Sequence, residues 1–164
     1  PIVCVPKKRE GEVRVCVDMR EPNKAIGREK DAMPTLDDLI ADLNGATVFS
    51  KLDMTQAYHQ LEIDEDSRQI TTFSTHVGLF RYKRLLFGVN AASEIFQNAI
   101  ANVLHDIPGA RNLSDDIIVF GTTQQEHDSN LKKTLQRLLE VGARLNRQKC
   151  IFSASELTFF GHVF

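Results

Sequence analysis

Two short, mostly apolar segments of the chain adjoin carboxylates, and this feature limits the possible folds more than any other. Residues 49–52 lead into Asp53, and Asp115 and Asp116 lead into the apolar residues 117–120. A charged side chain beside a hydrophobic core is costly unless it is paired or binds a metal ion. If the two segments are neighbouring strands, the three acids converge, and the sequence predicts a functional site at that point.

The chain contains its own comparison for the Asp115–Asp116 pair. The same dipeptide, Asp37–Asp38, falls in the first turn of a predicted helix, where the helix dipole favours negative charge and no ligand is needed. Asp115 and Asp116 instead fall at the tip of a predicted hairpin. Clustered carboxylate oxygens suit Mg²⁺, and two such ions about 3.5–4 Å apart can activate a hydroxyl nucleophile and stabilise a leaving oxygen.

Hydropathy periodicity predicts a mixture of strands and helices. Alternation and β-branched residues predict strands at 13–17, 47–52, 58–63, 71–75, 144–145 and 157–162. Apolar residues at three- and four-residue spacing predict helices at 35–43, 91–104 and 124–141. The last helix is expected to be amphipathic, with an apolar face of Leu131, Leu135, Leu138 and Leu139. Residues 7–12 are expected to form a basic hairpin tip.

The charge distribution excludes a strongly basic nucleic-acid binder but leaves local basic patches. The formal net charge is −2, yet residues 1–30 carry eight Lys or Arg side chains against five acidic ones. Such patches suit an enzyme that neutralises phosphates in one groove and metal ions with acids in another, although a solvated surface would look the same. No apolar run approaches the roughly 18–20 residues that cross a bilayer, so no membrane association is expected.

The cysteines and the ends of the chain give two further expectations. Cys4, Cys16 and Cys150 are widely spaced, and they predict buried thiols rather than a disulfide framework or a zinc site. The start without Met and the ending at Phe164 suggest a fragment of a longer polyprotein.

Several motifs in order resemble those of reverse transcriptases of gypsy-class LTR retrotransposons. They are Asp53–Gln60 (DMTQAYHQ), Phe87–Ala91 (FGVNA) with Phe96–Gln97, Ser114–Asp116, and Phe160–His162. Val17–Arg20 with Asn23–Lys24, and Asn146 with Lys149–Cys150, extend the likeness. Because the motifs keep their order and separations over nearly the whole chain, the resemblance is far more specific than any single motif.

The resemblance implies an α+β fold, a polymerase palm with a ferredoxin-like antiparallel sheet backed by helices. A fingers portion would comprise about residues 1–28 and 61–91, and the palm about residues 29–60 and 92–164, with the thumb absent. The implied enzyme is an RNA-directed DNA polymerase, a nucleotidyltransferase that adds deoxynucleotides to a primer 3′-hydroxyl on an RNA or DNA template. Asp53, Asp115 and Asp116 would be the catalytic acids that hold two Mg²⁺ ions, with Mn²⁺ as a possible substitute.

The resemblance also implies nucleotide-binding and primer-binding residues. Lys7 and Arg14 would grip the triphosphate, Tyr58 would exclude a 2′-hydroxyl, and Phe87 with Gly88 would lie beneath the nascent base pair. Gln56 and Ala57 would complete the nucleotide site. The residues implied at the primer are Leu113, Ser114, Phe160, Gly161 and His162. Leu113 departs from the family pattern, where Tyr is usual, which changes packing against the primer but leaves the acids intact.

The partners implied by the resemblance are an RNA/DNA template-primer, deoxynucleoside triphosphates and the rest of a polyprotein. That polyprotein would add a thumb, a ribonuclease H, a protease and an integrase, in a cytoplasmic, intracellular retroelement particle. Without a thumb, the isolated fragment is expected to be weak or inactive. Two alternatives remain open: a catalytically decayed nucleic-acid-binding remnant, and an RNA-templated RNA polymerase. Retained acids weigh against the first, and Tyr58 weighs against the second.

Overall fold

The computed structural model describes residues 2–6, 13–27, 36–159 and 161–164. The chain divides into two compact units. Unit 1 comprises Pro1–Lys30 and Tyr58–Ile95, and unit 2 comprises Asp31–Ala57 and Phe96–Phe164. Each unit is described by itself below.

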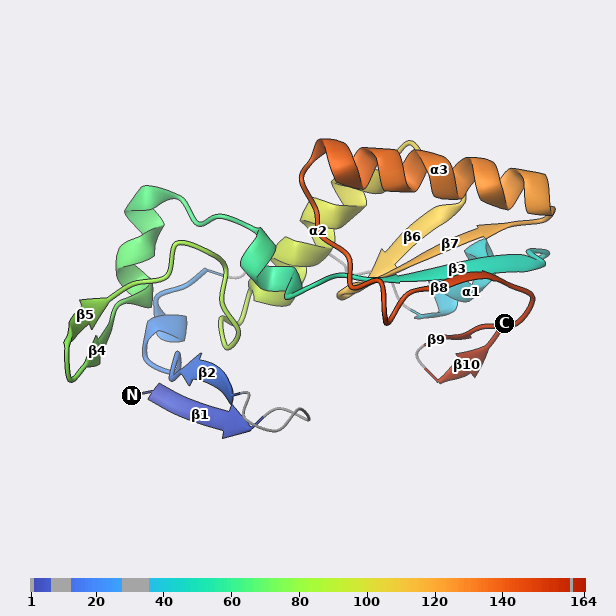
Figure 1. The fold of residues 1–164 in the computed structure, drawn as a ribbon. Helices are drawn as coiled ribbons and strands as arrows, with labels where there is room; N and C mark the ends of the chain where they lie inside the picture. Colours follow the sequence, from blue (N-terminus) through green and yellow to red (C-terminus); the bar gives the residue numbers. More distant parts are fainter. Residues whose placement is uncertain (1, 7–12, 28–35, 160) are drawn as a thin grey trace. The chain divides into compact units, whose positions relative to one another are not determined.

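A four-stranded antiparallel sheet in the order β6-β7-β3-β8 forms the centre of unit 2 (Figure 1). The strands are β3 (Val48–Asp53), β6 (Ala110–Leu113), β7 (Asp116–Gly121) and β8 (Ile151–Ala154). The inner strand β7 is almost continuously apolar because both of its faces are covered. The sequence did not predict β8, whose residues Ile151 and Phe152 are exposed.

The two faces of the sheet are covered by different elements. On one face, α3 (Gln124–Glu140) packs along β7 and β3 (Figure 1). On the other, α1 (Leu36–Asp42) and the hairpin of β9 (Thr158–Phe159) and β10 (His162–Val163) complete a second core. That core consists of Leu39, Leu43, Phe49, Ile118, Phe120, Leu157 and Phe159. Because side chains alternate along a strand, Lys51, Asp53 and Asp116 belong to this second face.

Helix α2 (Ala92–Leu104) agrees with the predicted helix over residues 91–104. Phe96, Ile100 and Leu104, four residues apart, are buried, whereas Ile95 is exposed. Helix α3 also lies where it was predicted, but its buried stripe differs from the expected leucine face. The helix buries His127, Asn130, Thr134 and Leu138, and it leaves Leu135 and Leu139 exposed. Polar anchoring replaces most of the expected apolar packing.

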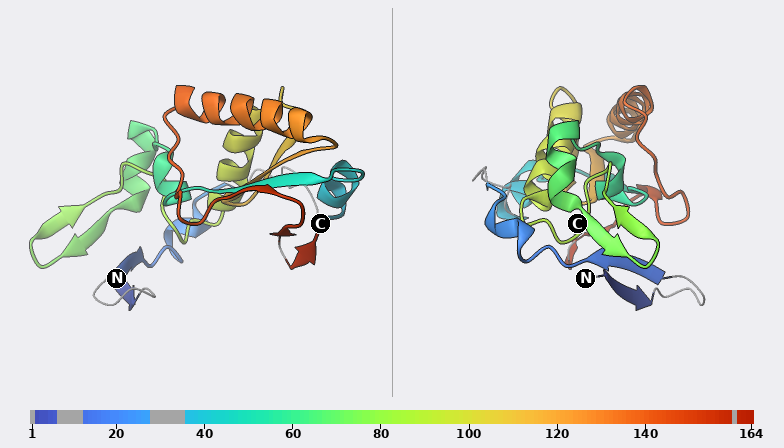
Figure 2. Two further views of the ribbon diagram at one scale, coloured as in Figure 1. Left: turned by 45° about the vertical axis from the view of Figure 1, so that its right-hand side comes forward. Right: turned by 90° about the vertical axis from the view of Figure 1, so that its left-hand side faces the viewer.

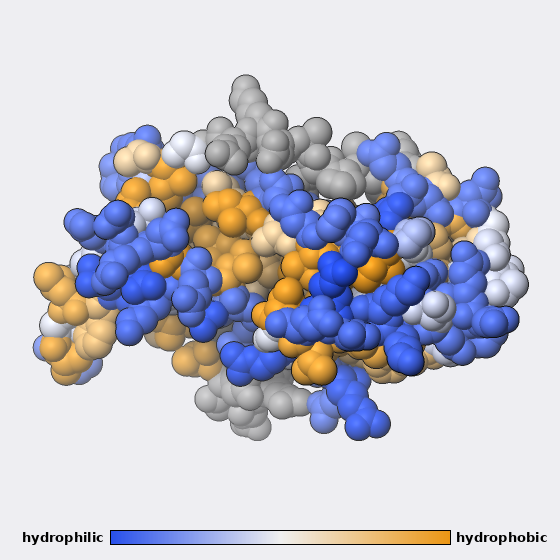
Figure 3. Space-filling model, turned by 90° about the horizontal axis from the view of Figure 1, so that it is seen from above, coloured by the Kyte–Doolittle hydropathy of each residue, from blue (hydrophilic) through white to orange (hydrophobic). Residues whose placement is uncertain are grey.

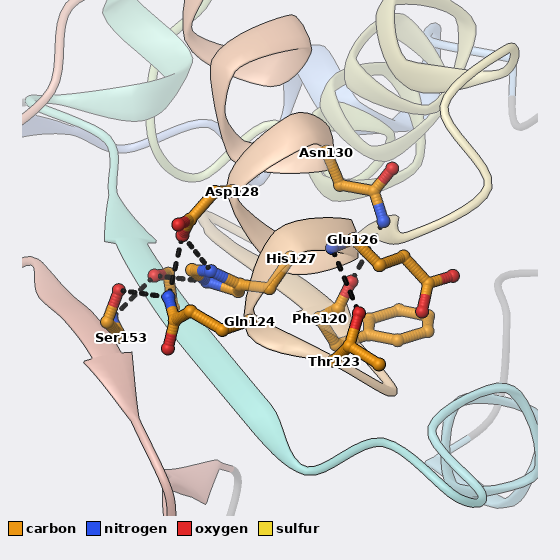
Figure 4. A network of polar contacts seen from close by, with 9 residues as sticks. Phe120, Thr123, Gln124, Glu126, His127, Asp128, Asn130 and Ser153 are labelled. Carbon is orange, nitrogen blue, oxygen red and sulfur yellow. Dashed lines mark hydrogen bonds and ion pairs between the residues drawn. The ribbon is translucent and has the colours of Figure 1, made fainter.

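His127 is the centre of a polar network that fixes α3 to the sheet (Figure 4). Its Nε2 lies 2.8 Å from the Ser50 hydroxyl, and its Nδ1 lies 2.9 Å from an Asp128 carboxylate oxygen. The Ser153 backbone N–H donates to the same Ser50 hydroxyl. Ser, His and Asp can form a nucleophilic triad, but Ser50 and His127 are fully buried. No substrate can reach this serine, so the network is structural.

The described residues of unit 1 form two antiparallel hairpins, two short 3₁₀ helices and most of a third, which begins at Ala57 of unit 2 (Figure 2). The first hairpin pairs β1 (Ile2–Pro6) with β2 (Val13–Val17), which confirms the predicted strand at 13–17. The second pairs β4 (Phe73–Thr75) with β5 (Gly78–Phe80), and exposed Leu79 and Phe80 make its surface apolar (Figure 3). The predicted hairpin tip at 7–12 lies outside the described residues.

The expected strand at residues 58–63 was wrong. Ala57–Gln60 is a 3₁₀ helix, and only an isolated bridge between Glu62 and Arg84 has strand character in the described part of this segment. The ring of Tyr58 packs on Phe87 with centroids 4.9 Å apart, and His59 meets the same ring edge-on. A turn places both rings on one partner, whereas neighbouring residues of a strand point to opposite faces.

The remaining differences are local. Glu65–Thr71 forms a 3₁₀ helix, which shortens the predicted strand at 71–75 to Phe73–Thr75. Leu145 of the predicted strand at 144–145 makes only a single bridge, to Met54. The cysteines were expected to be buried, but Cys4 is exposed and Cys16 and Cys150 are partly exposed; all three are free thiols. None of the described helices combines the length and apolarity needed to cross a membrane.

We expect Ser50→Ala to lower the free energy of unfolding by about 1–3 kcal/mol, because it leaves the fully buried His127 Nε2 without its partner and also removes the acceptor of the Ser153 N–H. Urea denaturation measures the change. The matched control is Ser74→Ala in β4, an exposed strand serine, which should change stability by less than about 0.5 kcal/mol. Equal stability of both variants would contradict the role given to the His127 network.

Candidate functional site

The pairing of β3 with β7 brings Asp53 and Asp116 together. Asp53 is the last residue of β3 and lies directly opposite Asp116, the first residue of β7. The predicted hairpin is also present, since Leu113 pairs with Asp116 across the turn at residues 114–115. Asp115 occupies the tip, where its backbone carbonyl accepts a hydrogen bond from the Met54 N–H at 3.2 Å. The condition on which the predicted site depends, that the two acidic strands are neighbours, is met.

Lysines compensate the charge of the two paired carboxylates. Lys51 Nζ lies 2.7 Å from an Asp116 oxygen, and Lys149 Nζ lies 3.3 Å from an Asp53 oxygen. Burial raises the pKa of Asp116, Lys51 offsets part of that rise, and the neighbouring charges of Asp115 and Asp53 add to it. The ionised form of Asp116 is therefore disfavoured mainly because the carboxylate is partly removed from water.

The donor atoms are of the kind that Mg²⁺ prefers, but the present arrangement is not a complete ligand set. Asp53 and Asp116 keep 17% of their side-chain surface exposed, so their oxygens can be reached from solvent. Within the described part of the chain, no three His, Cys, Asp or Glu side chains are grouped to hold a metal ion. The structure brings two carboxylates face to face with lysine partners, and a bound cation would have to replace those lysines.

Residues 146–150, near the end of the chain, contact both the backbone and the side chain of Asp53. The Asn146 N–H donates to the Asp53 carbonyl at 2.8 Å, and the Asp53 N–H donates to the Cys150 sulfur at 3.4 Å. With Lys149, these are the residues of the Asn146–Cys150 motif. The sequence indicated the motif but not its contacts with Asp53. Lys51 was not predicted as part of the site, although its position two residues before Asp53 on a strand places both on one face.

In unit 1, an asparagine side chain fixes the segment that follows Phe87. The Asn23 amide donates to the Gly88 carbonyl at 2.8 Å and accepts from the Asn90 N–H at 3.0 Å. Gly88 has a φ of +96°, a conformation that residues other than glycine rarely adopt. Asn23 thus holds the backbone directly after Phe87, the residue on which the Tyr58 ring packs.

The other predicted site residues lie as follows. Gln56 has a φ of 50° and is exposed, whereas Ala57 is buried and belongs to unit 2. Gly161, with a φ of +83°, lies in the turn between β9 and β10, and His162 is exposed. Lys7, Phe160 and the side chain of Arg14 lie outside the described parts.

The chain belongs to the reverse transcriptase (RNA-dependent DNA polymerase) family, which it matches over residues 5–164. The retrovirus-related Pol polyprotein from transposon 412 of Drosophila melanogaster is 35% identical over 169 residues, covering 99% of this chain and 14% of the relative. The chain thus spans about one seventh of the length of this relative.

Two solved structures of foamy viral protease-reverse transcriptase are also similar. The complex with double-stranded DNA gives a TM-score of 0.89 at 28% identity, covering 99% of this chain and 29% of that one. The complex with RNA/DNA hybrid gives 0.87 at 27% identity, covering 99% and 22%. The predicted α+β class, with an antiparallel sheet backed by helices as in a polymerase palm with fingers, is confirmed.

We expect Lys51→Met to lower the free energy of unfolding at neutral pH, without divalent ions, by about 1–2 kcal/mol, because Asp116 would face Asp53 without its partner. The raised pKa of Asp116 means that the folded chain binds this proton more readily than the unfolded chain, so ionised Asp116 costs stability above that pKa. The deficit should therefore shrink as pH falls. Lys132→Met, on the exposed surface of α3, is the control. A deficit that does not change with pH would contradict this explanation.

Proposed function

We propose that the chain is the fingers-and-palm part of an RNA-directed DNA polymerase from a gypsy-class LTR retrotransposon polyprotein. The observation that carries the proposal is the direct pairing of Asp53 with Asp116 beside the Asp115 turn. Membership of the reverse transcriptase family supports the same reaction: transfer of a deoxynucleotidyl group to a primer 3′-hydroxyl, with release of pyrophosphate.

In this proposal Asp53, Asp115 and Asp116 hold two Mg²⁺ ions, for which Mn²⁺ can substitute. Bound there, the ions would lower the pKa of the attacking hydroxyl and neutralise charge on the leaving oxygen. Lys51 and Lys149 keep the carboxylates charge-compensated until then. Lys149, of which 66% of the side chain is exposed, can withdraw into solvent more easily than Lys51, of which 24% is exposed.

The remaining predicted residues are assigned to substrate binding. Lys7 and Arg14 would hold the triphosphate, and Gln56 and Ala57 would complete the nucleotide site. Tyr58 is proposed as the steric gate against a 2′-hydroxyl, supported by its packing on Phe87. Phe87 and Gly88 would lie beneath the new base pair, in a segment that the Asn23 side chain holds by two hydrogen bonds. The residues assigned to the primer end are Leu113, Ser114, Phe160, Gly161 and His162.

The proposed partners follow from the same assignment. They are an RNA/DNA template-primer, deoxynucleoside triphosphates and the thumb, ribonuclease H, protease and integrase of a polyprotein, within a cytoplasmic particle. The residue ranges of the proposed fingers, about 1–28 and 61–91, nearly coincide with those of unit 1. The ranges of the proposed palm, about 29–60 and 92–164, nearly coincide with those of unit 2. A decayed nucleic-acid-binding remnant is the second candidate. The paired acids disfavour it, because a phosphate binder gains nothing from clustered carboxylates.

Primer extension on an RNA template with Mg²⁺ and deoxynucleotides tests the proposal. The assay uses the protein encoded by the longest reading frame that contains this chain. We expect Asp115→Asn to reduce extension by at least about 100-fold, as expected when charge stabilisation in the transition state is lost. Asp38→Asn in α1 changes the same dipeptide away from the site, and it should extend primers like the unchanged protein. A folded, template-binding protein that extends no primer would instead support the decayed remnant.

Ribonucleotide discrimination tests the proposed role of Tyr58. We expect Tyr58→Ala to raise the relative incorporation of ribonucleotides by about 10-fold or more, because the ring that would clash with a 2′-hydroxyl is removed. Single-nucleotide incorporation kinetics with matched deoxy- and ribonucleotides measure the ratio. Tyr82→Phe, which keeps an aromatic ring in the unit 1 core, should leave it unchanged. Unaltered selectivity in Tyr58→Ala would remove the gate from the proposal.

A further inference from the structure

The side chain of Gln97 binds the edge of the sheet beside the acidic turn. Its Nε2 donates to the Asn112 carbonyl at 2.8 Å, and its Oε1 accepts from the Ser114 N–H at 2.9 Å. These two backbone groups flank Leu113, so the amide bonds β6 much as a residue of a neighbouring strand would. Among the described strands, β6 pairs only with β7. Gln97 therefore occupies an edge that no described strand covers.

The contact is reciprocal and buried. The Asn112 side-chain amide donates to the Gln97 carbonyl at 3.1 Å, so two hydrogen bonds join α2 to β6 and a third joins α2 to the turn that follows it. Gln97 is 1% exposed and Asn112 is 6% exposed. Since buried amides are costly when unsatisfied, neither side chain can leave this arrangement without losing stability. The position of the turn is thereby fixed relative to α2.

The bond to Ser114 acts on the least favourable backbone conformation in the turn. Ser114 has a φ of 57°, in the left-handed region that residues other than glycine seldom adopt. Such a conformation persists only where its surroundings hold it. Ser114 directly precedes Asp115, and Asp116 must then begin β7 in register with Asp53. A turn that relaxed at Ser114 would displace both acids.

We propose that Gln97 is a positioning residue, which holds the Ser114 turn so that Asp115 and Asp116 meet Asp53 in the geometry needed for catalysis. The inference rests on the proposed function of these acids. Gln97 itself does not touch substrate; it acts through the backbone on either side of Leu113.

A second buried amide in the same unit provides a matched control. Asn130 of α3 is 7% exposed and donates to the Phe120 carbonyl at 3.0 Å. Phe120 lies near the opposite end of β7 from Asp116. Asn130→Leu therefore removes a buried side-chain hydrogen bond to β7, the strand that begins at Asp116, at the end of that strand away from the acids. If Gln97 were merely structural, Gln97→Met and Asn130→Leu would have similar effects.

The experiment compares Gln97→Met with Asn130→Leu in the longest reading frame that contains the chain. We expect Gln97→Met to lower kcat by about 10- to 100-fold with little change in the KM for deoxynucleotides, because misplacement of catalytic groups by about 1 Å has effects of this size. Mn²⁺ affinity, measured by electron paramagnetic resonance without substrate, should weaken by about 10-fold. Asn130→Leu should lower the melting temperature while keeping wild-type kcat and Mn²⁺ affinity.

Hydrogen–deuterium exchange of the peptide that contains Ser114 gives a readout independent of activity. Protection at Ser114 should be lost in Gln97→Met and kept in Asn130→Leu. Gln97→Glu keeps an acceptor for the Ser114 N–H but loses the donor to the Asn112 carbonyl, so its kcat, Mn²⁺ affinity and Ser114 protection should be intermediate. If Gln97→Met does not fold, Gln97→Glu takes its place in the comparison with Asn130→Leu. Wild-type kcat and Mn²⁺ affinity in Gln97→Met, or undiminished Ser114 protection, would overturn the inference. If the unchanged protein extends no primer, the proposed function fails, while Ser114 protection and Mn²⁺ affinity still test Gln97.

Discussion

The antiparallel pairing of β3 with β7 is the interaction on which the rest of unit 2 depends. Leu52, Ile117 and Val119 are fully buried along these strands, and this burial offsets the repulsion where Asp53 meets Asp116. Two like charges opposite each other would normally disfavour that register. Because a shift by one residue would turn every core side chain toward the wrong face, the apolar residues fix the register and the acids must follow.

Polar side chains hold the surroundings of the candidate site in place. His127 anchors α3 through Ser50, three residues before Asp53 on β3. Gln97 in unit 2 and Asn23 in unit 1 each use one side-chain amide to bind a donor and an acceptor of a nearby segment. Gln97 is buried, and a buried amide of this kind specifies one geometry, since any other leaves polar groups unpaired. Lys51 and Lys149 instead pair with Asp116 and Asp53 through long, flexible side chains, which can change partners more readily than a buried amide.

Prediction from the sequence succeeded where the local pattern was strong. The strand ending at Asp53 and helix α2 fall within one residue of their predicted bounds. It failed where tertiary contacts overrode the pattern. Tyr58 packs on Phe87 from a 3₁₀ helix instead of a strand. Helix α3 buries His127 while the expected Leu135 and Leu139 are exposed, because Ser50 supplies His127 with a partner from the sheet. Neither partner can be inferred from residues adjacent in the chain.

The sequence by itself determined that acids adjoin two apolar strands, that one pair lies at a hairpin tip, and that the ordered motifs resemble those of reverse transcriptases. These are properties of neighbouring residues, set by periodicity and turn chemistry. Only the tertiary structure decided that Asp53 lies opposite Asp116, that Lys51 and Lys149 pair with them, and that Gln97 braces the turn. These contacts join residues far apart in the chain, and they form only when hydrophobic burial has fixed the register of the sheet.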